Sequence, residues 1–368
     1  MHKKEPIRVL HILQRMEQAG VQTLLMNIYK NIDRDKIQFD FLVHYKTPYF
    51  FDEEIKKMGG KIYRLSFRED YNIIKYLKDL NSFFRNHPEY KIVHGHMHSL
   101  GVVYLHFAKK HNVPVRIAHS HTNFTQKDKK HLLKRIMCKL YSKNATHLFA
   151  CSKSAGEYMF GSKNFTVINN AIDSAKFIFD ERKRNKKRKE LGIDKNFVVG
   201  CVGRFEIQKN QKFAVEIFRD LIKKCPDSKL IFIGTGRLES EVKDLVRNYN
   251  LEKSIQFLGN RNDMVELFQA MDVFLFPSLF EGLGIVAVEA QAAGTPVVCS
   301  DNLPMEINVT PLINRVSLSN PTNDWVNSIL ESKNNKAKKT DTSNYIRQKK
   351  YDIKIVAKEL EDFYLKNW

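Results

Sequence analysis

The feature that most constrains the fold is a regular alternation between two kinds of segment. Short runs rich in β-branched and aromatic residues include IRVLHIL (7–13), KIVHGH (91–96) and VRIAHS (115–120). Between such runs lie segments with apolar residues at helical intervals, for example VQTLLMNIYKNI (21–32). Strands that alternate with amphipathic helices are typical of a parallel sheet covered on both faces. We therefore predict an α/β protein with doubly wound sheets.

The alternation is interrupted once, which indicates two domains. Residues 173–195 are polar and basic, and the apolar runs FVVGCVG (197–203) and SKLIFIG (228–234) then restart the pattern. The chain of 368 residues also exceeds the size at which one hydrophobic core normally keeps growing. After residue 310 the pattern weakens until a final helical segment. We expect a first domain at 1–172, a second at 173–344, and a C-terminal helix at 345–368.

Targeting signals and cysteine usage indicate the compartment. The sequence has no run of about eighteen apolar residues, and its N-terminal apolar stretch lacks a small-residue cleavage site. The five cysteines have no paired spacing, which is typical of reduced thiols. We therefore expect a cytoplasmic protein.

The formal net charge of +20 indicates an anionic partner. RKRNKKRK (182–189) has seven basic residues in eight, and we expect it to form a solvated linker or a first helical turn. Residues 125–144 have the pattern of a basic amphipathic helix. It is either an ordinary surface helix or a contact with an anionic membrane.

The stretch FEGLGIVAVEA (280–290) carries two carboxylates among apolar residues. Glu281 lies in a glycine-rich loop after a strand, and Glu289 lies inside the following helix, which Gly294 should end. A carboxylate near a helix N-terminus is favourable, but this explanation does not extend to Glu289. Both side chains suit a polyhydroxyl ligand at the carboxyl ends of the strands, since hydroxyl groups donate to carboxylates.

Two glycine-containing turns of the second half are candidate phosphate sites. Gly203, Arg204 and Lys209 follow one strand and precede a helix, where backbone N–H groups and cations suit a diphosphate. Gly234 and Gly236 follow the next strand and would let backbone approach a ligand closely, although turns also use glycine for φ > 0.

Several segments together resemble the retaining, nucleotide-sugar-dependent glycosyltransferases of family 4. The resemblance is densest over 165–306 and is carried by VINNAID, GRFEIQKN, IFIGTGRLE and FPSLFEGLGIVAVEAQAAGTPVVCSD. RIAHSH and SDNLPMEI are similar to the bacterial exopolysaccharide and capsule enzymes of that family. The resemblance implies the GT-B fold, in which two doubly wound Rossmann-like domains face a central cleft and the C-terminal helix crosses back to the first domain.

The resemblance also implies an activity. Such an enzyme moves a hexose or N-acetylhexosamine from a nucleotide sugar, here expected to be a UDP-sugar, to a lipid-linked or polysaccharide acceptor. It retains the anomeric configuration and needs no metal and no cofactor. A metal-dependent transferase would instead show an Asp-x-Asp pair at a strand end. The one match, Asp33-Arg34-Asp35, lies in a polar turn and is interpreted as surface.

Site residues follow from the resemblance position by position. Arg204 and Lys209 would bind the donor diphosphate, Glu281 would contact the transferred sugar, and Glu289 would accept hydrogen bonds from the ribose. The family's first loop commonly has a Gly-Gly pair, and here only Gly20 of Ala19-Gly20 matches it. The remaining donor-site positions are glycines and N–H groups that approach phosphate: Gly203, Gly234, Gly236, Gly282, Leu283, Gly284 and Ile285.

All thirteen histidines precede residue 148. The family places one near the reacting sugar, and His119 and His121 of RIAHSH both compete for that role. We slightly favour His121, with His119 as a supporting or acceptor-side residue. In HGHMH, alternate residues His94, His96 and His98 would share a strand face. We interpret them as lining the cleft rather than as a metal site, because no carboxylate follows at ligand spacing.

We also consider two other functions. A sugar-nucleotide epimerase with the same fold would bind the donor without an acceptor. A basic nucleic-acid-binding protein is less favoured, because no RNA or DNA module is recognisable and the basic residues are not interleaved with stacking aromatics. The basic segment in the first domain favours a transferase at the inner face of the cell membrane that uses a lipid-linked acceptor.

Overall fold

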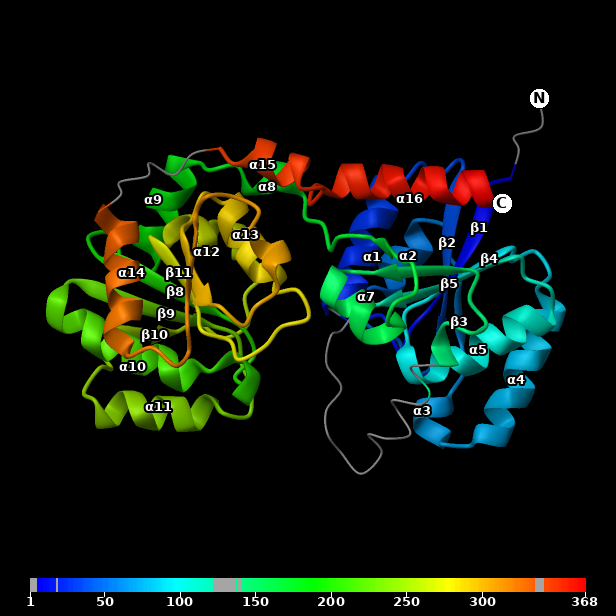
Figure 1. Ribbon diagram of the computed structural model, residues 1–368, viewed down its shortest axis with the longest axis horizontal. Coiled ribbons are helices and arrows are strands. Elements are labelled where there is room, and N and C mark those ends of the chain that lie inside the picture. The colour runs from blue at the N-terminus through cyan, green and yellow to red at the C-terminus, as the bar shows by residue number, and fades with distance from the viewer. Residues whose placement is uncertain (1–4, 18, 122–136, 138–139, 335–340) are drawn as a thin grey trace. The chain divides into compact units, whose positions relative to one another are not determined.

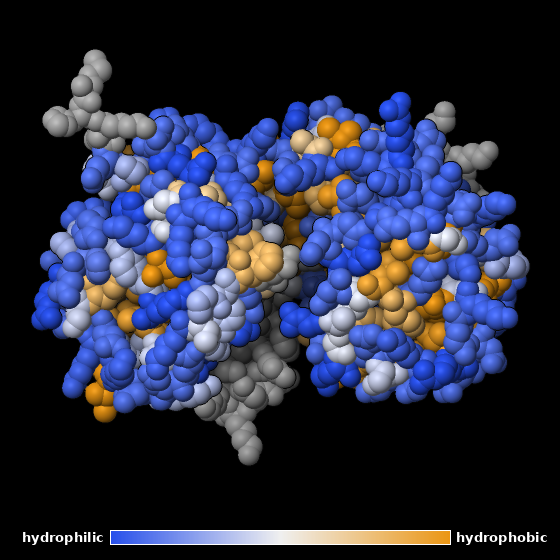
Figure 2. All heavy atoms as spheres, turned by 180° about the vertical axis from the view of Figure 1, so that it is seen from behind, coloured by the Kyte–Doolittle hydropathy of each residue, from blue (hydrophilic) through white to orange (hydrophobic). Residues whose placement is uncertain are grey.

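The computed structural model describes residues 5–17, 19–121, 137, 140–334 and 341–368 (Figure 1). The chain forms two compact units. Unit 1 comprises Met1–Asp173 and Lys350–Trp368, and unit 2 comprises Ser174–Lys349. On the face drawn in Figure 2, hydrophilic residues cover most of the surface, as expected for a chain with a net charge of +20.

Unit 1 is built on a seven-stranded sheet in the order β3-β2-β1-β4-β5-β6-β7, with every pair parallel. Its strands are β1 (Ile7–Ile12), β2 (Ile37–Val43), β3 (Ile62–Arg64), β4 (Ile92–Gly95), β5 (Val115–Ser120), β6 (His147–Ala150) and β7 (Thr166–Val167). Its helices are α1 (Gly20–Asn31), α2 (Asp52–Lys57), α3 (Phe67–Asp70), α4 (Ile73–Asn86), α5 (His98–Lys110), α7 (Lys153–Phe160) and α16 (Ile353–Asn367). The order reverses between β1 and β4, as in doubly wound sheets.

Apolar residues cover both faces of this sheet. One core cluster joins the strands to α1 and α16, and another joins them to α4, α5 and α7. Because side chains alternate along a strand, Val9 belongs to the first cluster and Leu10 to the second. The predicted alternation of strands and helices is therefore confirmed for this half.

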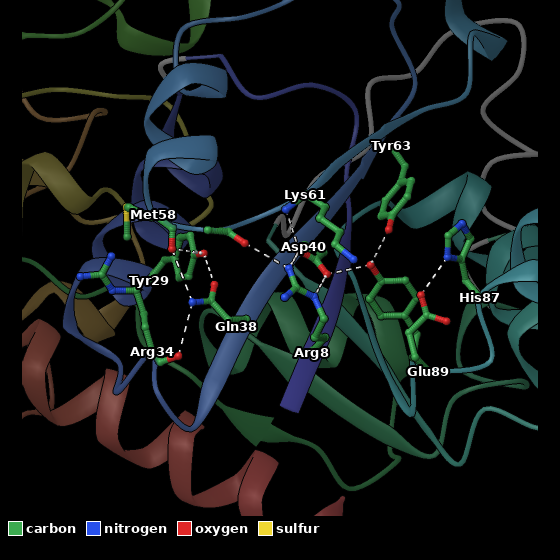
Figure 3. Close-up of polar contacts among 12 residues, drawn as sticks. Arg8, Tyr29, Arg34, Gln38, Asp40, Met58, Lys61, Tyr63, His87 and Glu89 are labelled. Atoms are coloured by element: carbon green, nitrogen blue, oxygen red, sulfur yellow. Dashed lines mark hydrogen bonds and ion pairs between the residues drawn. The ribbon is translucent and has the colours of Figure 1, made fainter. Parts of the chain in front are cut away.

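A buried carboxylate joins four segments of unit 1 (Figure 3). Asp40 of β2 accepts hydrogen bonds from Arg8 Nε and Nη2, both at 2.5 Å, and from the Tyr90 hydroxyl at 2.7 Å. The backbone N–H of Lys61 donates to the same carboxylate at 2.7 Å. Since a buried charge is costly unless it is paired and hydrogen-bonded, these donors account for the presence of Asp40 in the interior.

The C-terminal segment is two helices rather than the single predicted one. Helix α15 (Ser343–Gln348) belongs to unit 2, whereas α16 packs on α1 in unit 1. Between them, Tyr351 accepts a backbone hydrogen bond from Ile172, and Ile353 donates one back to Ile172. This strand-like pairing takes the backbone out of the helical conformation, so a continuous helix cannot form there.

Unit 2 contains a six-stranded parallel sheet in the order β10-β9-β8-β11-β12-β13. Its strands are β8 (Phe197–Val202), β9 (Ser228–Ile233), β10 (Ile255–Phe257), β11 (Val273–Phe276), β12 (Val297–Ser300) and β13 (Ile313–Val316). Its helices are α8 (Ser174–Phe177), α9 (Glu181–Glu190), η1 (Ile207–Lys209), α10 (Gln211–Lys224), α11 (Glu239–Asn248), α12 (Met264–Ala270), α13 (Ile285–Ala292), η2 (Met305–Ile307), α14 (Thr322–Asn334) and α15.

Two elements of unit 2 lie where the sequence pattern weakens. Strand β13 is at the sheet edge and is only partly buried, so it lacks the continuous apolar run of the inner strands. Helix α14 is nevertheless part of the core, because Trp325, Val326 and Ile329 are fully buried. The doubly wound organisation therefore continues beyond residue 310.

Of the two predicted forms of the basic run 182–189, the structure has the helical one, but the run continues beyond a first turn, and Lys187 and Arg188 are buried. It forms most of α9, whose N-terminus is capped by the Asp180 side chain. Arg184 donates to three carbonyl groups at the end of α12, and Arg188 donates to the Ala270 carbonyl and the Asp272 carboxylate. Cations at the C-terminal end of a helix satisfy carbonyls that have no partner within it.

The candidate membrane segment, 125–144, lies mostly outside the described residues. Among the helices that the structure describes, none combines the length and the apolar character needed to cross a membrane. Four of the five cysteines lie in the described part of the chain, and each is a buried free thiol.

Candidate functional site

The carboxyl ends of β8 and β11 bring together a lysine and a glutamate that are distant in sequence. Lys209, in η1 after β8, donates from Nζ to Glu281 Oε1 at 2.6 Å. Their side chains are only 18% and 8% exposed. Gln208 donates to the other carboxylate oxygen at 3.2 Å and to the Phe280 carbonyl at 2.9 Å. The loop that carries Glu281 is thus fixed to the loop after β8.

The two glycines of the loop after β9 are required by packing against the loop after β8, which the sequence did not reveal. Gly234 has φ = +127°, and a Cβ there would lie 2.4 Å from the Gly203 carbonyl oxygen. A Cβ on Gly236 would lie 2.5 Å from the Phe205 carbonyl oxygen. The loops after β8 and β9 therefore touch backbone to backbone, and this contact alone requires glycine. The role of these glycines toward a ligand stays a prediction.

Arg204 lies next to Gly203 on the same edge, and its side chain is exposed to solvent. Its backbone carbonyl accepts a hydrogen bond from Gln211 at 3.0 Å, which holds the loop against the start of α10. The guanidinium is accessible to an anionic ligand, but no contact of this structure tests that role.

The glycine-rich loop after β11 leads into the N-terminus of α13. Gly284 has φ = +91°, a conformation that side chains rarely adopt, and it directly precedes the first helical residue, Ile285. Leu283 is buried and Gly282 is partly exposed. No side chain caps the helix, so its first N–H groups and the positive end of its dipole are available for an anion. The predicted helix end at Gly294, with φ = +68°, is confirmed.

Glu289 differs from every other acidic residue of the site. It lies inside α13, and burial raises the pKa of its carboxyl to about 7. Within the described part of the chain, its side chain has neither an ion pair nor a hydrogen bond that would offset this cost. The side chain keeps partial contact with solvent, and a carboxyl with a raised pKa and no such compensation, in a helix that starts at the carboxyl edge of a sheet, is a functional candidate.

In unit 1, five histidines gather at the carboxyl ends of β1, β4 and β5. His11 Nδ1 lies 3.1 Å from His96 Nε2, and His96 Nδ1 lies 2.9 Å from His121 Nε2. His94 Nε2 lies 3.0 Å from His119 Nδ1. Burial lowers the pKa of His96 to about 3 and that of His94 well below its usual range. His94 and His96 are therefore neutral near pH 7.

The two histidines that compete for the sugar occupy different environments. His119 is buried, whereas His121 is partly exposed at the end of β5. Exposure makes His121 the more accessible to a substrate, although the choice between them stays a prediction. The expected shared strand face is not formed, because β4 ends at Gly95: His94 lies in the strand, His96 directly follows it, and His98 is the first residue of α5.

The predicted phosphate-facing glycine of unit 1 stands at the start of α1. Gly20 is exposed, and a Cβ added to it would have no atom within 4 Å. The preceding residue, Ala19, provides no side-chain cap to the helix. Packing thus gives no reason for glycine at this position, and open space adjoins the helix N-terminus.

Sequence reasoning missed Gln208, which contacts Glu281 in unit 2, and it missed His11 and Tyr364, which contact the histidine cluster of unit 1. His11 ends the first strand, and its position next to β4 would follow from a doubly wound strand order. The Tyr364 hydroxyl lies 2.7 Å from His94 Nδ1 although the two residues are 270 positions apart. No local pattern signals that contact.

Comparison with known proteins agrees with this architecture. Residues 19–176 match the family described as Glycosyltransferase Family 4, and residues 183–349 match the one described as Glycosyl transferases group 1. The chain is 33% identical over 335 residues to the putative glycosyltransferase EpsF of Bacillus subtilis (strain 168). That alignment covers 88% of this chain and 86% of the relative.

Two further proteins are similar over most of the chain. The UDP-Gal:alpha-D-GlcNAc-diphosphoundecaprenol alpha-1,3-galactosyltransferase of Escherichia coli is 26% identical over 312 residues, covering 80% of this chain and 79% of its own. The crystal structure of Anabaena HepE in complex with UDP and glucose has a TM-score of 0.80 at 18% identity. It covers 98% of this chain and 99% of that one, and so shows the same fold.

Proposed function

This chain belongs to the family 4 glycosyltransferases with the GT-B fold, and from that premise we propose that it transfers a hexose or N-acetylhexosamine from a UDP-sugar. The acceptor would be a lipid-linked saccharide or a growing polysaccharide in exopolysaccharide or capsule biosynthesis. The observation that carries the proposal is the Lys209–Glu281 ion pair in the loop that leads to the uncapped N-terminus of α13, and the raised pKa of Glu289 within that helix supports it.

The donor would bind at the carboxyl edge of the unit 2 sheet. Lys209 and Arg204 supply positive charge for a diphosphate, and the N–H groups of Leu283, Gly284 and Ile285 lie at the start of α13. Glu289 would accept hydrogen bonds from the ribose hydroxyls, which would give its carboxylate the donors that the described residues do not supply. HepE is similar in fold and was crystallised with UDP and glucose, which supports a UDP-sugar as donor.

Sugar transfer with retention would place most of the catalytic work on the leaving group. As the bond between the sugar and the diphosphate breaks, negative charge grows on the departing UDP. Lys209, Arg204 and the helix N-terminus would stabilise that charge electrostatically, so the reaction would not need a metal ion. Glu281, held by Lys209 and Gln208 at the same edge, would contact the hydroxyls of the transferred sugar.

The acceptor would be held by unit 1, with His121 closest to the reacting sugar and His119 in support. The E. coli relative acts on a diphosphoundecaprenol-linked GlcNAc, which supports a lipid-linked acceptor here. The basic segment 125–144 would hold the enzyme at an anionic membrane face, since each Lys or Arg near such a surface contributes about 1 kcal/mol.

The proposal is tested by incubating the purified chain with UDP-sugars and a membrane lipid extract, with and without EDTA. We expect labelled glycolipid whose amount EDTA does not reduce, and NMR of the product should show the anomeric configuration of the donor. Conversion of the UDP-sugar without any acceptor would instead indicate an epimerase. A product formed only when a divalent metal is added would contradict metal-independent transfer.

A further inference from the structure

The histidine cluster of unit 1 has the composition of a transition-metal site. Within the described residues, His96, His119 and His121 each offer a ring nitrogen, and these three atoms all lie within 4.8 Å of one another. The residues end β4 and β5, so a rigid parallel sheet holds two of the ligand segments in register. Imidazole suits Zn²⁺, Cu²⁺, Ni²⁺ and Co²⁺, and three histidines with an open fourth position are a known zinc arrangement.

Two of these three rings have an outward hydrogen bond of the kind that supports a metal ligand. His96 Nε2 lies 3.1 Å from His11 Nδ1, which leaves Nδ1 as the atom His96 would contribute. His119 Nδ1 lies 3.0 Å from His94 Nε2, so His119 would contribute Nε2. Metal-binding histidines usually donate their second N–H in this way, which fixes the ring and its tautomer.

The outer residues are themselves anchored. If His119 donates to His94 Nε2, then His94 carries its proton on Nδ1 and donates to the Tyr364 hydroxyl at 2.7 Å. Both nitrogens of His94 are thus used in hydrogen bonds. This argues against the alternative group of His11, His94 and His96, whose ligand atoms also lie within 4.8 Å of one another.

We propose that His96, His119 and His121 bind one divalent transition-metal ion of the Zn²⁺ type. His96 Nδ1 and His121 Nε2 are 2.9 Å apart, whereas two nitrogens bound tetrahedrally at 2.0 to 2.1 Å from zinc are about 3.3 Å apart. To admit the ion, the two nitrogens have to separate by about 0.4 Å, and the rings, which now face each other in a hydrogen bond, have to turn so that both nitrogens point at the ion. The partial exposure of His121 provides a route from solvent.

The ion has no step in the sugar transfer proposed above. Bound to His121, it would occupy the residue assigned to the reacting sugar, so it would inhibit transfer reversibly. That consequence rests on the proposed function. Metal binding itself does not, and it is measured without any sugar or nucleotide.

The test is a titration of the full chain, with any polyhistidine tag removed, using Co²⁺ alone and then Zn²⁺ as competitor. We expect one Co²⁺ per chain, with the visible absorption of a tetrahedral nitrogen-ligated ion, and displacement by Zn²⁺. His96→Gln and His121→Asn should each weaken binding at least 100-fold. His106→Ala removes an exposed histidine of α5 and should leave the affinity unchanged.

Tyr364→Phe is a milder variant that also tests metal binding if His96→Gln does not fold. It removes only the hydroxyl that anchors His94, the partner of the ligand His119. Loss of a ligand's direct partner typically costs 10- to 100-fold in metal affinity, so one contact further out we expect a loss of up to about 10-fold. Failure to bind Co²⁺ stoichiometrically would overturn the proposal. Unchanged affinity in His121→Asn would also overturn it, because the ion would then bind the other group of histidines.

Discussion

Replacing Glu289 with glutamine should make the protein more stable while it weakens nucleotide binding. In the folded chain, burial raises the pKa of this carboxyl from 4.5 to about 7. The folded state therefore binds the proton more tightly than the unfolded state does. As the pH rises from 4.5 to 7, the stability that comes from the protonated form is lost. Glutamine resembles the protonated form at every pH and avoids this loss.

The size of the effect follows from the pKa shift. A change of 2.5 pKa units, at about 1.4 kcal/mol per unit, corresponds to about 3 kcal/mol. At pH 8 we expect Glu289→Gln to exceed the natural protein in unfolding free energy by about that amount, and at pH 5 by less than about 1 kcal/mol. For a domain of this size, 3 kcal/mol corresponds to an increase in Tm of about 6 to 12 °C.

The assay combines urea unfolding at pH 5 and pH 8, without nucleotide, with calorimetric titration of UDP. Loss of a hydrogen bond to a charged acceptor costs about 1.5 to 3 kcal/mol, so UDP affinity should fall roughly 10- to 100-fold. Glu252→Gln, an exposed residue of the same unit, is the matched control and should change neither quantity. A Glu289→Gln protein less stable than the natural one at pH 8 would refute the reasoning, because it would mean that the carboxylate stabilises the fold.

Three other predictions concern Lys209, Gly20 and Asp40. Lys209→Ala should lower kcat about 100- to 1,000-fold with a sugar donor, whereas Lys212→Ala, whose partner is the exposed Glu241, should leave it unchanged; equal kinetics would remove the diphosphate role. Gly20→Ala should leave Tm unchanged, because its Cβ meets open space, but raise KM for the donor; a lowered Tm would argue for a packing role. Asp40→Asn should destabilise unit 1 by about 3 to 5 kcal/mol in urea unfolding, because Arg8 loses its buried partner.

The sequence predicts those parts of the fold that depend on residues close to one another in the chain. Inner strands such as β8 are continuous apolar runs because both faces are covered, so they are recognisable without a structure. Strand β13 has a neighbour on one side only and is half exposed, so its pattern is weak. The break between α15 and α16 depends on pairing with Ile172, a contact between distant residues that periodicity does not encode.

The same distinction applies to the candidate site. Parallel strands end at one edge of a sheet, so Lys209 and Glu281 could be assigned to the same edge from strand order alone. Their ion pair at 2.6 Å, and the contact of Gly234 with the Gly203 carbonyl, depend on loop conformations that strand order does not determine. The sequence therefore predicts a ligand contact for Gly234 and Gly236, whereas the backbone of the neighbouring loop by itself requires glycine at both positions.

The division of unit 1 into two stretches of sequence sets an order for its maturation on the ribosome. Unit 2 is continuous, so all of its strands are available once residue 349 has been made. Unit 1 has its whole sheet by residue 173, but α16 packs against α1 and supplies Tyr364 to its core. While the ribosome translates unit 2, the nascent sheet therefore leaves exposed the part of this apolar face that α16 later covers, and His94 gains the Tyr364 hydroxyl last.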